Sequence, residues 1–253
     1  MEKWLERTAL LIDEDKIDKL ANSHVLIVGL GGVGSFAAEF ICRAGVGRMT
    51  IIDGDNFDET NKNRQLTALD STIGRNKAEV LGERLLDINP KLNLTIIQEF
   101  VLPDRVWEIL KEAKPDYVMD CIDSVTPKLE WIKATKVLKY KLISHLGAGG
   151  KMDPTKVQVV NLTQTHNCKL ATHLKKRLKK DGIHFKTIRA VFSSELQQKK
   201  SLKLTDGSNF KRSFYGTVSY MPALFGLMGA ADVIRYLMED DGRKMKARIL
   251  TED

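Results

Sequence analysis

Continuous apolar runs, glycine turns and amphipathic segments alternate along the first 150 residues of the chain. His24–Val28 is almost entirely apolar and is followed by Gly29, which is typical of a strand buried on both faces of a parallel sheet. A helix over Ser35–Ala44 and a second strand over Arg48–Asp53 follow it. Strand, glycine turn, helix and strand within about thirty residues predict a βαβ unit.

The same alternation continues to residue 150. We expect further strands over Leu94–Ile97, Tyr117–Asp120 and Leu142–His145, and helices over Leu10–Ala21, Lys77–Ile88, Pro103–Ala113 and Thr126–Val137. Regular alternation of strands and helices indicates an α/β fold, here a Rossmann-like, doubly wound and mostly parallel sheet.

The pattern changes after Gly150, where we expect an integral C-terminal extension. Its predicted elements are a strand over Val157–Val160, a basic helix over Leu170–Lys180, a strand over Ile188–Ser193, a flexible loop over Glu195–Arg212 and a closing helix over Pro222–Met238. No change in composition marks a linker. We therefore expect a core of residues 1–150 and an extension of residues 151–253 within one domain.

Composition excludes several classes of protein. The chain has 253 residues, 43% hydrophobic and 29% charged, as in ordinary globular proteins. The apolar stretch Met221–Leu237 is interrupted by Pro222, Asp232 and Arg235, and a membrane span needs about 20 consecutive apolar residues, so we expect no membrane association. The charged N-terminus lacks a signal peptide, which favours a cytoplasmic protein. The three cysteines form no CxxC pair, so neither a zinc site nor a disulfide framework is expected.

The net charge of +7 is unevenly distributed. Two basic segments lie in the second half of the chain, and such clusters indicate binding to a nucleic acid. The alternative is a solvated helix face. The candidate nucleic-acid-binding residues are Lys175, Lys176, Arg177, Lys179, Lys180, Lys211 and Arg212, and Tyr215 and Tyr220 could stack on bases unless Tyr220 merely packs on the closing helix.

The glycine loop after the first strand predicts a phosphate site at a helix N-terminus. Its candidate nucleotide-binding residues are Gly29, Gly31, Gly32 and Gly34, and Asp53 at the end of the second strand would bind a ribose hydroxyl. These features suit NAD as well as ATP. A set of polar and cationic residues further along favours ATP split between its α- and β-phosphates, because fixed cations and Mg²⁺ stabilise the charge that develops there. The set comprises Asp55, Asn61, Arg64, Lys77 and Asp123, the last as the Mg²⁺ ligand.

Four motifs in order, VLIVGLGGVGS, DGDNFDETNKNRQ, GRNKAE and DCIDS, resemble the ThiF/MoeB superfamily, which is related to ubiquitin-activating enzymes. The resemblance implies adenylation of a carboxylate, with Gly31, Gly32 and Gly34 at the phosphates and Asp53 at the ribose. It places Asn61, Arg64 and Lys77 at the phosphates and Asp123 at the metal. It also implies a homodimer in which Arg7 reaches the partner's ATP. Structural alternatives stay open: Asn61 and Arg64 pinning a helix, Asp123 as an N-cap, and Arg7 or Lys77 as surface residues.

Later motifs resemble the tRNA threonylcarbamoyladenosine dehydratase branch: Asp123–Lys128, Gly147–Thr155, Val191–Glu195 and Gly216–Gly226. The implied reaction adenylates the threonyl carboxylate of the modified adenosine, and a ureido nitrogen then closes a ring and expels AMP. The stretch Ser213–Ser219 lacks the cysteine found in some relatives, and Cys168 is expected to be an ordinary thiol. The alternatives are an enzyme that adenylates the C-terminus of a ubiquitin-like or sulfur-carrier protein, with such a carrier as partner, and an NAD-dependent dehydrogenase.

Overall fold

Seven strands form one sheet in the order β3-β2-β1-β4-β5-β7-β6, and every pair is parallel except β6 with β7. The computed structural model describes residues 2–205 and 213–239. The strands are β1 (His24–Val28), β2 (Arg48–Ile52), β3 (Asn93–Ile97), β4 (Tyr117–Asp120), β5 (Lys141–His145), β6 (Val157–Asn161) and β7 (Arg189–Ser193). The Rossmann-like α/β fold is confirmed, and β6 and β7 extend the same sheet rather than form another.

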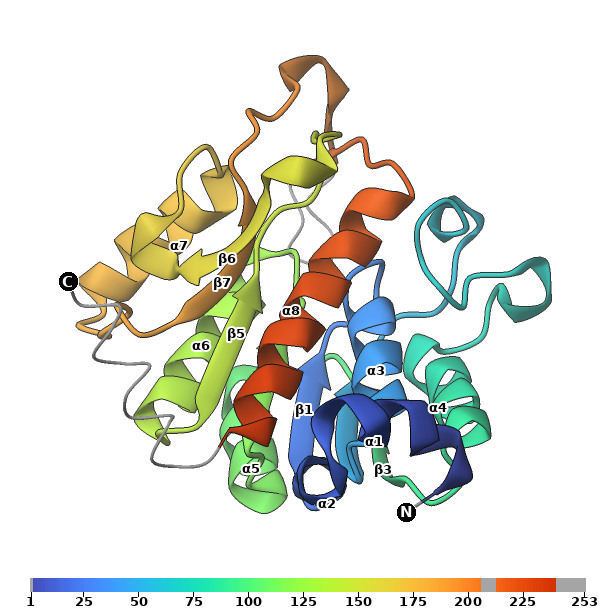
Figure 1. Ribbon diagram of the computed structural model, residues 1–253. Helices are drawn as coiled ribbons and strands as arrows, with labels where there is room; N and C mark the ends of the chain where they lie inside the picture. The colour runs from blue at the N-terminus through green and yellow to red at the C-terminus, as the bar shows by residue number, and fades with distance from the viewer. Residues whose placement is uncertain (1, 206–212, 240–253) are drawn as a thin grey trace.

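Helices cover both faces of the sheet (Figure 1). On one face α8 (Tyr220–Met238) lies along α3 (Gly34–Arg43), with α2 (Glu14–Ala21) and α4 (Lys77–Ile88) beside them. On the other face lie α5 (Pro103–Ala113), α6 (Val125–Val137) and α7 (Lys169–Lys180). Short 3₁₀ helices span Lys3–Leu5, Glu59–Asn61, Asp70–Thr72, Pro154–Lys156, Leu162–Gln164 and Lys199–Ser201.

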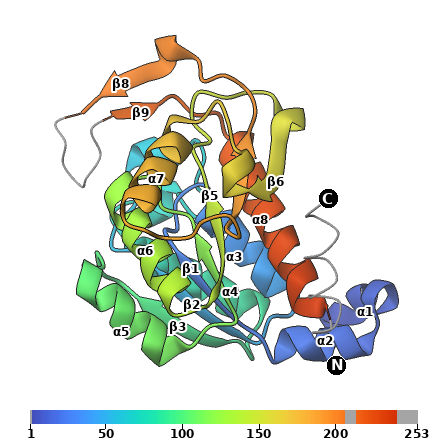
Figure 2. The ribbon, with the colours of Figure 1, turned by 90° about the vertical axis from the view of Figure 1, so that its left-hand side faces the viewer.

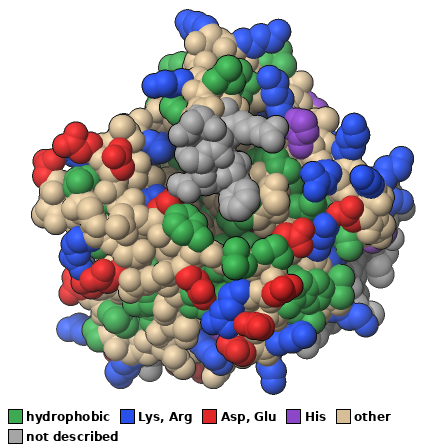
Figure 3. All heavy atoms as spheres, turned by 180° about the vertical axis from the view of Figure 1, so that it is seen from behind, with side chains coloured by type: hydrophobic (Ala, Val, Ile, Leu, Met, Phe, Trp, Pro, Cys, Tyr) green, Lys and Arg blue, Asp and Glu red, His purple; other side chains and the backbone are tan. Residues whose placement is uncertain are grey.

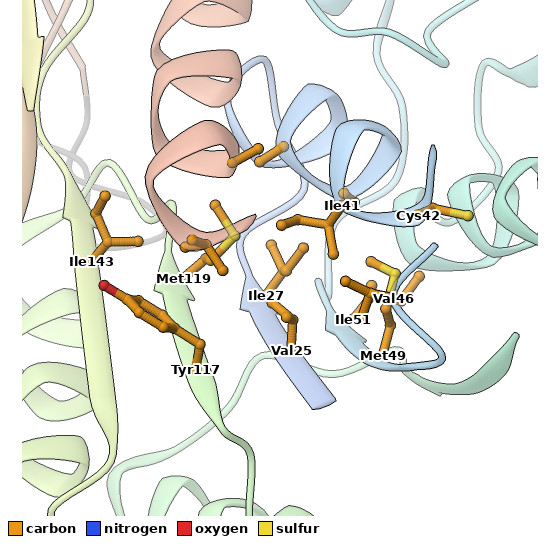
Figure 4. Packing of buried hydrophobic residues seen from close by; sticks show 14 of the residues in the cluster. Val25, Ile27, Ile41, Cys42, Val46, Met49, Ile51, Tyr117, Met119 and Ile143 are labelled. Atoms are coloured by element: carbon orange, nitrogen blue, oxygen red, sulfur yellow. The ribbon is translucent and has the colours of Figure 1, made fainter. Parts of the chain in front are cut away.

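Two apolar cores follow from this layering, one on each face. The core between the sheet and α3 is shown in Figure 4, where Val25 and Ile27 of β1 and Ile51 of β2 point toward Ile41. The other core contains Trp131 of α6, which is 1% exposed. Strands buried from both sides carry apolar residues at successive positions, which is why the runs read from the sequence marked them correctly.

Two local predictions were wrong. The expected helix Leu10–Ala21 is two helices, α1 (Glu6–Ile12) and α2, which meet at Asp13 with φ of 71°. The segment Glu195–Arg212 was expected to be a flexible loop, and residues 206–212 of it lie outside the described residues. Its described part contains β8 (Leu202–Leu204), which pairs antiparallel with β9 (Ser213–Tyr215). Three-residue strands carry too short an alternation to be recognised from sequence.

Helix α8 is long and apolar enough to cross a membrane by length and composition. In the structure it is a core helix, because Met221, Phe225, Ala230 and Val233 are all 0% exposed and belong to the apolar core between α3 and the sheet.

Candidate functional site

The glycine loop lies between β1 and α3, where the chain order of the sheet reverses: β2 pairs on one side of β1 and β4 on the other. Ligands of open α/β sheets bind at the carboxyl edge of this point. Gly29 has φ of 83°, and a Cβ on Gly34 would lie 1.8 Å from the carbonyl oxygen of Gly29. A Cβ on Gly32 would lie 2.9 Å from the oxygen of Arg64. The loop therefore needs glycine at these positions for its own packing.

Gly31 differs from the other loop glycines. Within the described chain, the heavy atom that a Cβ there would approach is Nε2 of Gln65, at 3.7 Å. Gln65 is 8% exposed, and its Oε1 has no hydrogen-bond partner among the described residues. A buried amide oxygen without a partner costs free energy unless a bound molecule donates to it. Gln65 is a candidate site residue that the sequence analysis did not single out.

Asp53 follows β2 and faces the glycine loop. Its Oδ2 accepts a hydrogen bond from the backbone N–H of Leu30 at 2.6 Å, and its Oδ1 accepts one from Asp55 at 2.8 Å. Burial raises the pKa of the Asp53 carboxyl, and Lys77 opposes that shift. Since Asp53 is bonded to the loop and close to a buried cation, its carboxylate is held where a sugar hydroxyl above the loop would meet it.

Lys77 is the first residue of α4 and is 7% exposed, so the alternative of an ordinary surface lysine is wrong. Its Nζ lies 3.1 Å from Oδ2 of Asp55, and its backbone N–H donates to the carbonyl of the same residue. Asn76 caps α4 by accepting from the N–H groups of residues 78 and 79. The helix start thus fixes a buried ammonium group beside Asp53.

Asn61 and Arg64 both make structural contacts. Asn61 closes a capping box with Asp58 around the 3₁₀ helix Glu59–Asn61, and the guanidinium of Arg64 donates to the carbonyl of Thr60 at 2.8 Å. Arg64 is half-buried, and burial lowers its pKa although Asp123 opposes the shift. The charges of Asp123 and Arg64 are therefore close enough to interact. The N-cap of α6 is Ser124, so Asp123 is not the cap.

A buried ion pair, also missed from the sequence, supports the turn that carries Asp123. Nζ of Lys128 lies 2.6 Å from Oδ2 of Asp120, and both side chains are 0% exposed. The hydroxyl of Ser144 donates to the same Oδ2, and the N–H of Ile122 donates to Oδ1. The Asp120 carboxylate therefore joins β4, β5, α6 and the first residues of the turn.

His145 lies at the end of β5, as expected, but is only 2% exposed. Its Nδ1 lies 3.1 Å from the carbonyl oxygen of Asp120, and its Nε2 has no hydrogen-bond partner among the described residues. A Cβ on Gly229 would lie 2.0 Å from that Nε2, so α8 seals the ring. Burial lowers the pKa of His145 to about 3, which keeps the imidazole neutral.

The later motifs Gly147–Thr155, Val191–Glu195 and Gly216–Gly226 also lie toward the carboxyl edge of the sheet. Glu195 accepts hydrogen bonds from the N–H groups of Met152 and Asp153, both at 2.8 Å, and Lys151 donates to the carbonyl of Ser193. The amide of Asn63 donates to the carbonyl of Thr217 at 3.0 Å. This last bond ties the Asn61–Arg64 segment to the segment that follows β9.

The basic residues of the extension differ in their exposure. Lys175 is half-buried and donates to the carbonyl of Thr165 at 2.7 Å. Lys176, Arg177, Lys179 and Lys180 of α7 are exposed. Lys and Arg side chains gather on the side of the molecule where α7 lies (Figure 3). Lys211 and Arg212 lie outside the described residues. Cys168 is 3% exposed, as expected of a structural thiol.

Arg7 does not meet the other site residues within one chain. It lies exposed on α1, which packs on α2 at the end of the sheet where the strands begin (Figure 1). α1 has no buried residue, and its Leu10 and Leu11 are each 83% exposed.

The sequence and the fold are similar to those of known proteins. The ThiF family model matches residues 5–253. A tRNA threonylcarbamoyladenosine dehydratase of Escherichia coli is 43% identical over 181 residues, 70% of this chain and 67% of that protein. One of Bacillus subtilis is 33% identical over 92% of this chain and 94% of that protein. A crystal structure of the E. coli enzyme in complex with ATP has a TM-score of 0.84 at 36% identity and covers 94% of this chain and 96% of that one. The chain belongs to the ThiF family.

Proposed function

We propose that this protein is an ATP-dependent tRNA threonylcarbamoyladenosine dehydratase. The threonyl carboxylate attacks the α-phosphorus of ATP and expels pyrophosphate. A ureido nitrogen of the same nucleotide then attacks the activated carbonyl, and AMP leaves with the carboxylate oxygen. The net change in the RNA is the loss of one water. Because the nucleophile is intramolecular, positioning supplies much of the rate.

The observation that carries this proposal is a buried lysine and a half-buried arginine near a glycine loop with room at Gly31. Lys77 is 7% exposed and lies beside Asp53. Arg64 is half-buried, and its Cγ would lie 3.2 Å from a Cβ on Gly32. Cations shielded from water stabilise charge on an α-phosphate and on leaving pyrophosphate more strongly than exposed ones. We assign the phosphates to Gly29, Gly31, Gly32, Gly34, Asn61, Arg64 and Lys77, with Asp55 holding Lys77 and Asp53 at the ribose.

Mg²⁺ fits the site as a companion of ATP. No three His, Cys, Asp or Glu side chains converge into a metal cluster within the described ranges. Mg²⁺ commonly binds phosphates and water with only one or two carboxylates, and Asp123 suits that part. The ion would neutralise phosphate charge when bound. Asp123 would hold the ion.

The native assembly proposed is a cytoplasmic homodimer in which Arg7 acts in trans. The exposed Leu10 and Leu11 on the same helix support this, because adjacent exposed apolar side chains are suited to a protein interface. The core of residues 1–150 would bind ATP, and the extension of residues 151–253 would bind tRNA. The exposed residues Lys176, Arg177, Lys179 and Lys180 suit its phosphates, with Lys175, Lys211 and Arg212 as further candidates.

The test is to incubate the protein with ATP, Mg²⁺ and tRNA from cells that lack the activity, and to measure digested nucleosides by mass spectrometry. We expect threonylcarbamoyladenosine to lose one water. Lys77→Ala should abolish the loss, whereas Lys62→Ala, which removes an exposed lysine paired with Asp70, should not. An unchanged nucleoside would refute the proposal. Pyrophosphate exchange that requires an added carrier protein would assign the site to carrier activation instead.

A further inference from the structure

A cavity of about 310 Å³ lies between the N-terminal end of α7 and the segments that flank the β8–β9 hairpin. Figure 2 shows the hairpin above α7. The side chains that matter here are Lys169 and His173 from α7, Lys199 before β8, and Tyr215 at the end of β9. The volume falls within the usual range of ligand sites, about 300 to 1,000 Å³.

Tyr215 is held in place by the glycines beneath it. A Cβ on Gly150 would lie 3.0 Å from Cδ1 of the ring, and Gly150 has φ of 74°. The N–H of Gly150 donates to the carbonyl of Gly216 at 2.8 Å, and Gln198 donates to the carbonyl of Gly150 at 2.8 Å. One side of the aromatic ring therefore rests on glycine backbone, and the ring also lines the cavity.

The charge around the ring is positive. Nζ of Lys169 lies 5.8 Å from the centre of the Tyr215 ring, within the range of a cation–π contact. Lys199 and His173 also line the cavity, and the exposed basic side chains of α7 continue from it. An aromatic platform within a groove of cations is the combination by which proteins hold single-stranded nucleotides.

The segment that follows Tyr215 contacts the segment that carries Arg64. Thr217, two residues beyond Tyr215, accepts the hydrogen bond from Asn63, the neighbour of Arg64. A second cavity of about 220 Å³ adjoins this segment and is lined by Gly150, Gly216 and Thr217 among others. A nucleotide whose carboxylate reaches ATP would thus leave the adjoining nucleotide near Tyr215.

We propose that this cavity binds an unstacked base adjacent to the modified adenosine, with the base stacked on Tyr215 and its phosphate at Lys169. The proposal rests on the proposed function, since it takes tRNA as the substrate. It adds a second recognition site. Discrimination among RNAs then depends on an unstacked neighbouring base as well as on the modified nucleotide.

The test uses anticodon stem-loops that carry threonylcarbamoyladenosine, with the base on its 5′ or 3′ side intact or replaced by an abasic site. Binding is measured by fluorescence anisotropy. For the wild-type protein, one of the two abasic RNAs should bind about tenfold more weakly, as stacking on one aromatic side chain predicts. Tyr215→Ala should bind the intact RNA about tenfold more weakly than the wild-type protein does, and it should bind the intact and the abasic RNA equally well. Tyr215→Phe should restore the distinction.

Phe214→Ala is the matched control. Phe214 is the preceding residue of β9 and is 40% exposed, and its ring contacts Lys203 rather than the cavity. We expect it to leave the tenfold distinction intact. Lys169→Ala, at an exposed position, should lower the slope of log affinity against log salt by about one ion, and Tyr215→Ala should leave that slope unchanged.

A Tyr215→Ala protein that still distinguishes intact from abasic RNA overturns the cavity assignment. If Tyr215→Ala does not fold, the wild-type protein is crosslinked to RNAs that carry 4-thiouridine at the adjoining position. We expect the crosslink in a peptide that contains Lys169 or Tyr215. A crosslink confined to other peptides overturns the proposal. If the wild-type protein dehydrates tRNA while these tests fail, the second recognition site is refuted and the proposed function stands. If the wild-type protein does not dehydrate tRNA, the proposed function itself is refuted.

Discussion

Replacing Lys128 with methionine should lower the free energy of unfolding by about 3 to 5 kcal/mol, because it leaves the carboxylate of Asp120 buried without its cation. Both side chains are 0% exposed and the two charges lie 2.6 Å apart. Methionine fills most of the space of the lysine stem, so the loss comes from the charge rather than from a void. Asp120 keeps the hydrogen bonds from Ser144 and Ile122, which do not neutralise it.

Urea unfolding followed by circular dichroism measures this loss. With a denaturant slope of about 3 kcal/mol per molar, the expected loss moves the midpoint down by about 1 to 2 M. The variant with both Lys128→Met and Asp120→Asn should recover most of it, because no charge is then left unpaired. A midpoint within experimental error of the wild type, or a double variant less stable than the single one, would refute the reasoning.

The pH dependence of the Lys128→Met variant has a definite sign. Burial raises the pKa of Asp120, and Lys128 opposes that rise, so the variant raises the pKa of Asp120 further. A carboxyl whose folded pKa exceeds its unfolded value of about 3.9 costs stability above that value, and the cost disappears as the pH falls toward it. The deficit relative to the wild type should therefore be largest near neutral pH and shrink in acid. A deficit that grows in acid would contradict the assignment.

The remaining predictions concern the nucleotide site, the dimer and acid stability. Gly34→Ala should unfold at a markedly lower temperature, since its Cβ would lie 1.8 Å from a carbonyl oxygen, whereas Gly31→Ala should melt normally and bind ATP more weakly by calorimetry. Arg7→Ala and Lys77→Ala should each be inactive alone, but mixed and reassembled dimers should recover about a quarter of the sites, because each mixed dimer has one intact site; no recovery would exclude action in trans. His145, with its pKa lowered to about 3, should make stability fall as the pH drops below about 6.5, and His145→Asn should flatten that fall by close to one proton.

The parts of the fold that could be predicted are those in which local pattern and burial agree. The strand over Tyr117–Asp120 and the helices over Lys77–Ile88 and Pro103–Ala113 were predicted with their observed bounds. Their ends are marked by local chemistry: Asn76 caps the first of these helices, and Pro103 opens the second. The break at Asp13 left no such mark, because the apolar spacing continues across it into α2.

The parts of the site that escaped prediction depend on pairing between distant segments. Asp120 and Lys128 read as a strand end and a helix lysine, and neither residue shows from the sequence that Ser144 of the next strand will complete a buried network. The orphaned oxygen of Gln65 depends on the close approach of Gly31 from another turn. Motif matching identified residues that a ligand would touch, such as Lys77 and Asp123. It could not identify residues that hold the ligand's surroundings in place, because their signal is burial, which only the folded chain provides.

The glycine loop and Tyr215 lie at the two ends of the proposed site, and different parts of the chain support them. The glycine loop is closely packed on itself, since Gly34 lies against Gly29. Tyr215 packs instead on Gly150, which lies about 120 residues away from that loop along the chain and follows β5. The bond from Asn63 to Thr217 is a direct contact between the segment that carries Arg64 and the segment that follows Tyr215. Since catalysis by an intramolecular nucleophile depends on alignment of the RNA with ATP, loosening this bond should lower turnover more than it lowers affinity for either substrate alone.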